Sequence, residues 1–205
     1  MIEPYYSEDG ITLYCAKCED VLPQLQADVV ITDPPYGVGY EYGEYVDTPE
    51  NFERTILQTV RWCAENIPTA VNMSMRQMWK LPPAKWVLCW YKPGSTRRNA
   101  VGGFSIWEPI FLYGKGWRVA NDAIRLPDVT NHSAGNKHPC PKPLKLVSWI
   151  MNQHGGETVL DPFAGSGTTL LAAKRFGRKA IGIEMSEDYC RIIVERLGQR
   201  EMIFD

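Results

Sequence analysis

The sequence predicts an α/β fold in which one central, mostly parallel sheet is flanked by helices. Apolar segments of strand length alternate with segments of helical periodicity, most regularly over residues 144–198, and such alternation indicates βαβ units. The chain has 205 residues, of which 44% are hydrophobic, and this suits a single domain with one core. No internal repeat or low-complexity linker divides it.

The N-terminal part is expected to hold strands, two helices and several loops. Runs rich in β-branched and aromatic residues predict strands at 11–17, 28–33, 69–73, 86–91 and 107–113. A short helix is expected at 20–26. A longer one is expected at 48–66, because Thr48 is a candidate N-cap, Pro49 follows it, and apolar residues then recur at helical spacing. Glycine-containing polar stretches predict loops at 37–46, 93–103 and 131–140.

The last third alternates between the two kinds of element. Helices are expected at 144–153, 167–176 and 186–197, and strands at 158–161 and 179–184. A strand, a helix and a second strand in succession imply parallel pairing with a right-handed crossover.

Composition narrows the classes of partner and compartment. The formal net charge is −2, so nucleic-acid binding would need a local basic patch. No apolar run reaches the length of about 20 residues that spans a bilayer, and the first residues are acidic, so we expect a cytoplasmic protein with no membrane partner. Cys15 and Cys18 form a Cys-x-x-Cys without a second ligand pair, so no metal site and no disulfide are expected.

The segment "VVITDPPYG" ends an apolar strand with an acid, two prolines and an aromatic residue. Two prolines stop a strand because neither has an N–H for the ladder, so a simple terminator explains the pattern. The alternative is a stiff segment of Asp33, Pro34, Pro35 and Tyr36 at the carboxyl end of a strand, where open α/β sheets place their ligands.

The segment "VLDPFAGSGTTLLAAKRFG" places a small-residue turn between a strand and a helix. Gly165 and Gly167 allow the backbone to approach a ligand, although a structural tight turn explains them equally. Leu170 stands where a dinucleotide fingerprint has its third glycine, and no P-loop follows. Glu184 ends the next strand and can accept hydrogen bonds from ribose hydroxyls, so the two features together favour an adenosine compound.

The motifs "TDPPYG", "HPCPKPLKLVSWIM", "LDPFAGSGTT" and "AIGIE" resemble those of the S-adenosylmethionine-dependent amino-methyltransferases of DNA, the adenine-N6 and cytosine-N4 enzymes of restriction–modification and phage origin. The resemblance covers most of the chain, from Asp20 to Glu184. It implies a Rossmann-like class I methyltransferase fold with circularly permuted motif order, because the Asp-Pro-Pro-Tyr motif comes first. The implied division is a catalytic half at about 11–116, a short connecting or target-recognition region at about 117–137, and a cofactor half at about 138–198.

The resemblance also implies the residues of a cofactor site and a DNA substrate with its target base flipped out. The cofactor-binding residues it implies are Asp20, Lys142, Pro143, Asp161, Phe163, Gly165, Gly167, Thr168 and Glu184. Asp20 would reach the adenine of the cofactor, Lys142 and Pro143 would lie beside its methionine part, and a helix N-cap is the alternative role of Asp20.

The chemistry of amine methylation explains the Asp-Pro-Pro-Tyr motif. The lone pair of an exocyclic amine is delocalised into the base, so two fixed acceptors on its N–H groups would make it a better nucleophile. The Asp33 carboxylate and the Pro34 carbonyl can serve as these acceptors, while Pro35 restricts the backbone in advance. Tyr36 can stack on a flipped base. Cys140 follows a proline as in cytosine-5 enzymes, but its position in the motif order makes it incidental.

Substrate recognition is less well specified. Lys92, Arg97, Arg98 and Lys115 give local positive charge for phosphate contacts, although solvated loops explain them equally. Residues 118–136 leave room for little beyond connecting structure, so a homodimer, a partner subunit or a short, loosely read site would compensate.

Adenine is favoured over cytosine because the Asp-Pro-Pro-Tyr form is commoner in the adenine enzymes. The alternatives are an RNA or protein amino-methyltransferase, and an inactive nucleic-acid-binding subunit with the same fold.

Overall fold

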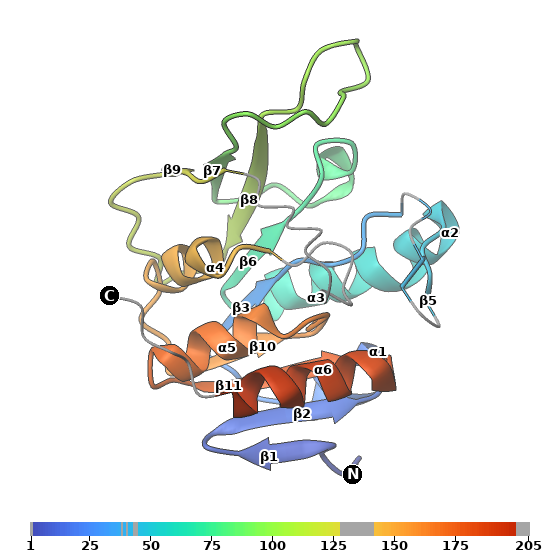
Figure 1. The fold of residues 1–205 in the computed structure, drawn as a ribbon, viewed down its shortest axis with the longest axis vertical. Helices are drawn as coiled ribbons and strands as arrows, with labels where there is room; N and C mark the ends of the chain where they lie inside the picture. Colours follow the sequence, from blue (N-terminus) through green and yellow to red (C-terminus); the bar gives the residue numbers. More distant parts are fainter. Residues whose placement is uncertain (1, 38, 40, 43–44, 128–141, 200–205) are drawn as a thin grey trace.

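One nine-stranded sheet lies at the centre of the described part of the chain, in the order β1-β2-β11-β10-β3-β6-β8-β7-β9 (Figure 1). The computed structural model describes residues 2–37, 39, 41–42, 45–127 and 142–199. The predicted loop at 131–140 and Cys140 therefore lie outside the described residues. None of the described helices combines the length and the apolar character needed to cross a membrane.

The middle of the sheet is parallel, as the alternation of elements predicts. The parallel strands are β2 (Ile11–Cys15), β11 (Lys179–Glu184), β10 (Thr158–Asp161), β3 (Val29–Thr32) and β6 (Thr69–Asn72). The strands β8 (Trp107–Tyr113) and β7 (Trp86–Tyr91) continue the sheet in antiparallel pairing, and β1 (Tyr6–Glu8) pairs antiparallel with β2 at the other end. The mixed α/β fold predicted from the sequence is confirmed.

Helices cover both faces of the sheet, so its central strands are buried on both sides. In β3, Val29 and Ile31 pack in a core with α4 (Leu144–Met151), α5 (Thr168–Arg175) and α6 (Glu187–Gly198). Val30, which points the other way, packs in a second core with α1 (Cys18–Val21) and Cys63 of α3 (Leu57–Asn66). Alternation along a single strand thus joins the two layers.

The helix predicted at 48–66 is present, but it is not regular throughout. The side chain of Thr48 accepts a hydrogen bond from the Asn51 N–H at 3.1 Å, so the N-cap prediction is confirmed. The segment then runs as α2 (Pro49–Asn51), a π-helical turn η2 (Phe52–Ile56) and α3. The π turn borders the cavity described below, through Arg54, Thr55 and Ile56.

Other predictions need correction. The helix expected at 20–26 starts earlier, as α1, and continues as the 3-10 helix η1 (Leu22–Gln24), because Pro23 cannot continue the α-helical ladder. The N-cap of α1 is Lys17 and not Asp20. The loop expected at 37–46 contains two short paired strands, β4 (Glu41–Tyr42) and β5 (Tyr45–Val46). The strands β1 and β9 (Ala123–Arg125) and the 3-10 helix η3 (Met78–Lys80) were not predicted.

The topology brings several loops to one edge of the sheet. The parallel strands β2, β11, β10, β3 and β6 all end there. Because β8 is antiparallel to both β6 and β7, the loop that connects β7 to β8 lies at the same edge. Residues 15–19, 33–37, 73–77, 92–106, 162–167 and 185–186 therefore meet at this edge, although they are far apart in the chain. The predicted boundaries of the two halves stay a prediction.

Candidate active site

A cavity of about 780 Å³ opens at this edge of the sheet. It lies where ligands bind in open α/β sheets, outside the carboxyl ends of the strands. Most of the predicted site residues line it. They are Asp33, Pro34, Pro35, Tyr36, Arg97, Lys142, Asp161, Phe163, Gly165, Thr168 and Glu184.

The Asp-Pro-Pro-Tyr segment follows β3 directly and is held from both sides. The carbonyl of Tyr36 accepts a hydrogen bond from the Gln77 side chain at 2.8 Å, and the Gly37 N–H donates to the buried Asp47 carboxylate at 2.7 Å. Gly37 has a φ of +67°, and a Cβ there would lie 2.8 Å from the Cβ of Phe52. The segment is thus fixed before any ligand binds, which favours the functional interpretation over a simple strand terminator.

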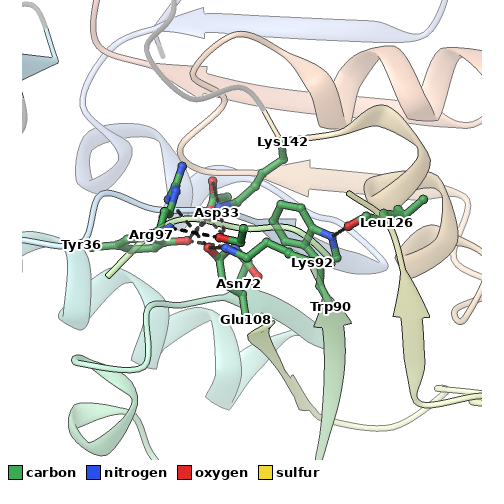
Figure 2. Close-up of polar contacts among 10 residues, drawn as sticks. Asp33, Tyr36, Asn72, Trp90, Lys92, Arg97, Glu108, Leu126 and Lys142 are labelled. Atoms are coloured by element: carbon green, nitrogen blue, oxygen red, sulfur yellow. Dashed lines mark hydrogen bonds and ion pairs between the residues drawn. The ribbon is translucent and has the colours of Figure 1, made fainter. Parts of the chain in front are cut away.

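Both oxygens of the Asp33 carboxylate have partners. The Tyr36 hydroxyl donates to Oδ1 at 2.5 Å, and the Asn72 amide donates to the same oxygen at 3.1 Å. The Lys142 ammonium lies 3.3 Å from Oδ2. Burial and the charge of Asp33 raise the pKa of Tyr36 well above its ordinary value, so Tyr36 is a neutral donor here. Figure 2 shows these side chains converging on one point.

Glu108 connects this point to the interior of the sheet. Its carboxylate pairs with Lys92 at 2.5 Å and with Lys142 at 3.2 Å, and it accepts a hydrogen bond from Asn72 at 3.2 Å (Figure 2). Burial alone would raise the pKa of Glu108, but Lys142 and Lys92 lower it to about 2. Asn72 and Glu108 were not predicted from the sequence as site residues. One signal in the sequence could have indicated an ion pair between neighbouring strands. Glu108 lies within the apolar run "SIWEPIFLY", and Lys92 ends the apolar run "VLCWYK".

From β10 to β11, away from Asp33, the cavity wall has carboxylates with neutral partners. The Thr32 hydroxyl donates to the Asp161 carboxylate at 2.7 Å, and the Phe163 N–H donates to it at 3.1 Å. Burial raises the pKa of Asp161 to about 6. Since Thr32 precedes Asp33, the Thr32–Asp161 hydrogen bond joins the ends of β3 and β10 directly.

Glu184 closes the glycine loop. Its Oε2 accepts a hydrogen bond from the Gly165 N–H at 2.8 Å, and its Oε1 accepts one from the Ser186 N–H at 2.9 Å. Burial raises the pKa of Glu184 to about 7, although both backbone donors oppose the shift. Each oxygen keeps a further lone pair for a hydroxyl donor.

A family model described as DNA methylase matches residues 69–195, which is more than half of the chain. The chain belongs to the N6/N4 DNA methylase family. The type II methyltransferase M2.DpnII of Streptococcus pneumoniae is 40% identical to it over 249 residues, covering 96% of this chain and 93% of the relative.

Two solved structures are similar to this member of the methylase family. The cytosine-N4-specific PvuII DNA methyltransferase has a TM-score of 0.73 at 17% identity, covering 98% of this chain and 90% of its own. The complex of M1.HpyAVI with SAM has a TM-score of 0.65 at 24% identity, covering 91% of this chain and 99% of its own. The family and the class I methyltransferase fold implied by the motifs are both confirmed.

Within this methylase fold, the predicted glycine-loop residues have different surroundings. Gly165 lines the cavity, and so does Thr168, whose buried hydroxyl has no hydrogen-bond partner among the described residues. Gly167 is not among the lining residues. It is the N-cap of α5 with a φ of +78°, and a Cβ there would lie 2.8 Å from Ile193 of α6. Gly167 thus serves helix packing.

Of three other predicted residues, two do not line the cavity and one does. Asp20 is exposed and does not line the cavity, whereas its neighbours Cys18 and Glu19 do. Pro143 is the N-cap of α4 and is also outside the cavity lining. Lys142 does line the cavity, and its ammonium contacts Asp33, Tyr36 and Glu108. It therefore lies at the Asp33 end of the cavity, and its place beside the methionine part of the cofactor stays a prediction.

The predicted phosphate-contacting residues also differ from one another. Lys92 is 1% exposed and paired with Glu108, so the structure contradicts its placement on a surface loop. Arg97 and Arg98 are exposed on the β7–β8 loop, as expected. The Arg97 guanidinium lies 3.9 Å from Glu108 and lines the cavity, so it lies at the mouth of the site.

Proposed function

We propose that this methylase transfers a methyl group from S-adenosylmethionine to the exocyclic N6 amino group of adenine in DNA. The observation that carries the proposal is a single cavity lined by both motifs, with Asp33 at one end and Glu184 at the other. The Thr32–Asp161 hydrogen bond fixes the carboxyl end of β3 against that of β10, so the two motifs have one geometry.

The residues at the Glu184 end fit the cofactor. S-adenosylmethionine carries a positive sulfonium and ribose hydroxyls, and when bound it supplies an electrophilic methyl group. The buried carboxylate of Asp161 and the half-buried carboxylate of Glu184 line this end, and neither pairs with a cation within the described part of the chain. Glu184 would accept the ribose hydroxyls, and the unpartnered Thr168 hydroxyl offers one more polar contact. The M1.HpyAVI complex, which contains SAM in the same fold, supports this assignment.

The residues at the Asp33 end fit an amine. A carboxylate has about four lone-pair sites. Hydrogen bonds from Tyr36 and Asn72 occupy the two lone-pair sites of Oδ1. The Lys142 ammonium occupies one site on Oδ2, which leaves one site on Oδ2 for a further donor. That site and the Pro34 carbonyl would accept the two N–H hydrogens of the exocyclic amine and free its lone pair for attack. The charge of Asp33 also stabilises the positive charge that develops on the nitrogen.

The substrate is proposed to be duplex DNA with the target base flipped into the cavity, because an amine inside the base stack cannot reach Asp33. Arg97 and Arg98 would contact the phosphates. Adenine is proposed because the Asp-Pro-Pro-Tyr form is commoner in adenine enzymes. Cytosine-N4 is the second candidate, and the fold shared with PvuII DNA methyltransferase favours it.

The intact network argues against an inactive binding subunit. Asp33, Tyr36 and Glu184 all have defined partners at the cavity wall, and a subunit without activity has no use for buried ionic groups there. The type II relative M2.DpnII supports a role in DNA modification.

The test is transfer of labelled methyl from S-adenosylmethionine to unmodified duplex DNA, followed by nucleoside analysis. We expect label on N6 of adenine, and its loss in an Asp33→Ala variant that still binds S-adenosylhomocysteine. RNA and protein from the same cells serve as parallel substrates. Label on cytosine-N4 would support the second candidate, and label only on RNA or protein would refute the DNA proposal.

A further inference from the structure

Residues 93–106, within the loop that connects β7 to β8, form an ordered projection that we call the finger. In Figure 1 it extends beyond the sheet at the top of the molecule. Its two sides are paired: the Ser105 N–H donates to the Arg97 carbonyl at 2.7 Å, the Asn99 N–H donates to the Gly103 carbonyl at 3.0 Å, and Arg98 and Phe104 form an antiparallel bridge. The finger is therefore a small hairpin with a defined shape.

The tip of the finger is fixed by one side chain and presents another to solvent. The Asn99 carboxamide oxygen accepts hydrogen bonds from the Val101 N–H at 3.0 Å and the Gly103 N–H at 2.9 Å. Gly102 turns the chain with a φ of +89°. Val101 is 91% exposed as a result. The turn therefore holds one apolar, solvent-facing side chain in a fixed position at the tip of the finger.

The base of the finger adjoins the catalytic end of the cavity. The finger begins next to Lys92 and ends shortly before Glu108, and these two residues are paired at 2.5 Å. Arg97, on the finger itself, lines the cavity. Arg98 lies over the ring of Phe104 at 4.8 Å, which keeps its charge close to the tip. Two positive charges thus lie on one arm of the finger, between its apolar tip and the cavity that the target base is proposed to enter.

We propose that the finger enters the duplex and that Val101 occupies the space in the base stack which the flipped nucleotide leaves. This inference rests on the proposed function. An extruded base leaves an apolar gap between its neighbours, and apolar side chains are known to wedge between base steps. Arg97 and Arg98, both on the first arm of the finger, suit phosphates beside such a gap, since they complement the charge of the backbone.

A contact with a second copy of the chain is the alternative use of the finger. Stable protein interfaces bury about 800 Å² on each partner, with an apolar centre that is depleted of charge. The finger exposes Val101, Phe104 and Ile106, but it is a narrow hairpin that also carries Arg97 and Arg98, so it is too small and too charged for that role. DNA is the partner that its chemistry fits.

The experiment compares two DNA substrates. One is a fully paired duplex, and in the other the target adenine faces an abasic site, so that it is already unpaired. For Val101→Ala we expect kcat/KM on the paired duplex to fall about tenfold, because two apolar methyl groups leave the stack. On the unpaired substrate we expect a change within about twofold, because little extrusion energy is then required.

The matched control is Val87→Ala, an exposed valine on β7 outside the finger. We expect its kcat/KM to equal that of the wild type on both substrates. Equal losses for Val101→Ala on the two substrates, or no loss on either, would overturn the proposed role. A fall in the sedimentation coefficient of Val101→Ala would also overturn it, in favour of a contact between copies. Wild-type protein that methylates neither substrate refutes the proposed function itself, and the two failures are thereby distinguished.

Discussion

The two ends of the cavity, called the catalytic end and the cofactor end after the proposed function, hold carboxylates in opposite electrostatic states. At the catalytic end Asp33 and Glu108 share the cation Lys142, Glu108 also pairs with Lys92, and the pKa of Glu108 is lowered to about 2. At the cofactor end the Glu184 carboxylate accepts hydrogen bonds from the backbone N–H groups of Gly165 and Ser186, with no cation paired to it among the described residues, and burial raises its pKa to about 7. Both ends are at the same sheet edge, so the difference comes from the side chains that each strand delivers there.

This difference indicates which charge each end is prepared to receive. At the catalytic end Lys142 and Lys92 compensate the charges of Asp33 and Glu108, so both carboxylates are held in place by the chain itself. The cofactor end keeps its negative charge uncompensated within the described residues, and a cationic ligand would complete it. A buried charge without a partner costs stability, and such costs are found where function requires them.

The largest effect should separate chemistry from cofactor binding. Asp33→Asn keeps the shape of the side chain but removes its charge, and we expect methyl transfer to DNA to fall about a thousandfold. The Kd for S-adenosylhomocysteine, measured by calorimetry, should change less than about threefold. An equal loss of transfer and of cofactor affinity would mean that the two ends are not independent.

Glu108→Gln tests the ionic network at the catalytic end. The change leaves the buried Lys92 without its carboxylate partner, and we expect it to lower the free energy of unfolding by about 3 kcal/mol in urea titrations. A Glu108→Gln, Lys92→Met double variant should regain part of this loss. If the double variant is less stable than the single one, the pair does not act as a unit.

The same network predicts a pH dependence. The folded-state pKa of Glu108 lies below its ordinary value of 4.5, so its contribution is present above pH 4.5 and is lost as pH falls toward 2. The difference in Tm between wild type and Glu108→Gln should be constant at neutral pH and shrink below about pH 4.5. A difference that is independent of pH would show that the charge of Glu108 is not what stabilises the fold.

The raised pKa of Glu184 predicts a smaller effect at the other end, on affinity. Ribose hydroxyls need the ionised carboxylate, which is mostly protonated below a pKa of about 7. The Kd for S-adenosylhomocysteine should therefore rise about tenfold between about pH 8 and pH 6, and Glu184→Gln should bind weakly with a flat profile. A pH-dependent profile in Glu184→Gln would assign the titration to another group.

The smallest effect concerns Gly167, which belongs to the cofactor motif but packs on α6. Gly167→Ala places a Cβ against Ile193 at positive φ, and we expect a loss of about 1–2 kcal/mol in unfolding free energy. Ile193→Ala in the same chain should recover the steric part. Affinity for S-adenosylhomocysteine should stay unchanged, and a large loss of affinity would restore Gly167 to the cofactor site.

Most strands and helices could be predicted from the sequence, because apolar periodicity and motif spacing are local features of the chain. The bounds of β7, β8, β10 and β11 agree with the prediction. The strands β1 and β9 have three residues each, and pairing with a neighbouring strand, not their own composition, creates them. Local patterns carry no information about such pairing.

The ionic network could not be predicted for a related reason. Lys92 looks like a surface cation at the end of a strand, and only the antiparallel pairing of β7 with β8 places it beside Glu108. Asn72 likewise ends an ordinary apolar strand. The Asp-Pro-Pro-Tyr and glycine motifs were recognisable because each is continuous in the chain, whereas the network draws one residue from each of several strands.

The hydrogen bond between Thr32 and Asp161 joins residues 129 positions apart. During synthesis the N-terminal part leaves the ribosome first, while β10, which pairs with one side of β3, has not yet been made. One edge of β3 therefore has no pairing strand until the last quarter of the chain emerges. Until then the Thr32 hydroxyl also lacks its hydrogen-bond acceptor, the Asp161 carboxylate. Assembly of the catalytic centre is consequently a late event of translation, and a nascent chain truncated before residue 158 should modify no DNA while it is still attached to the ribosome.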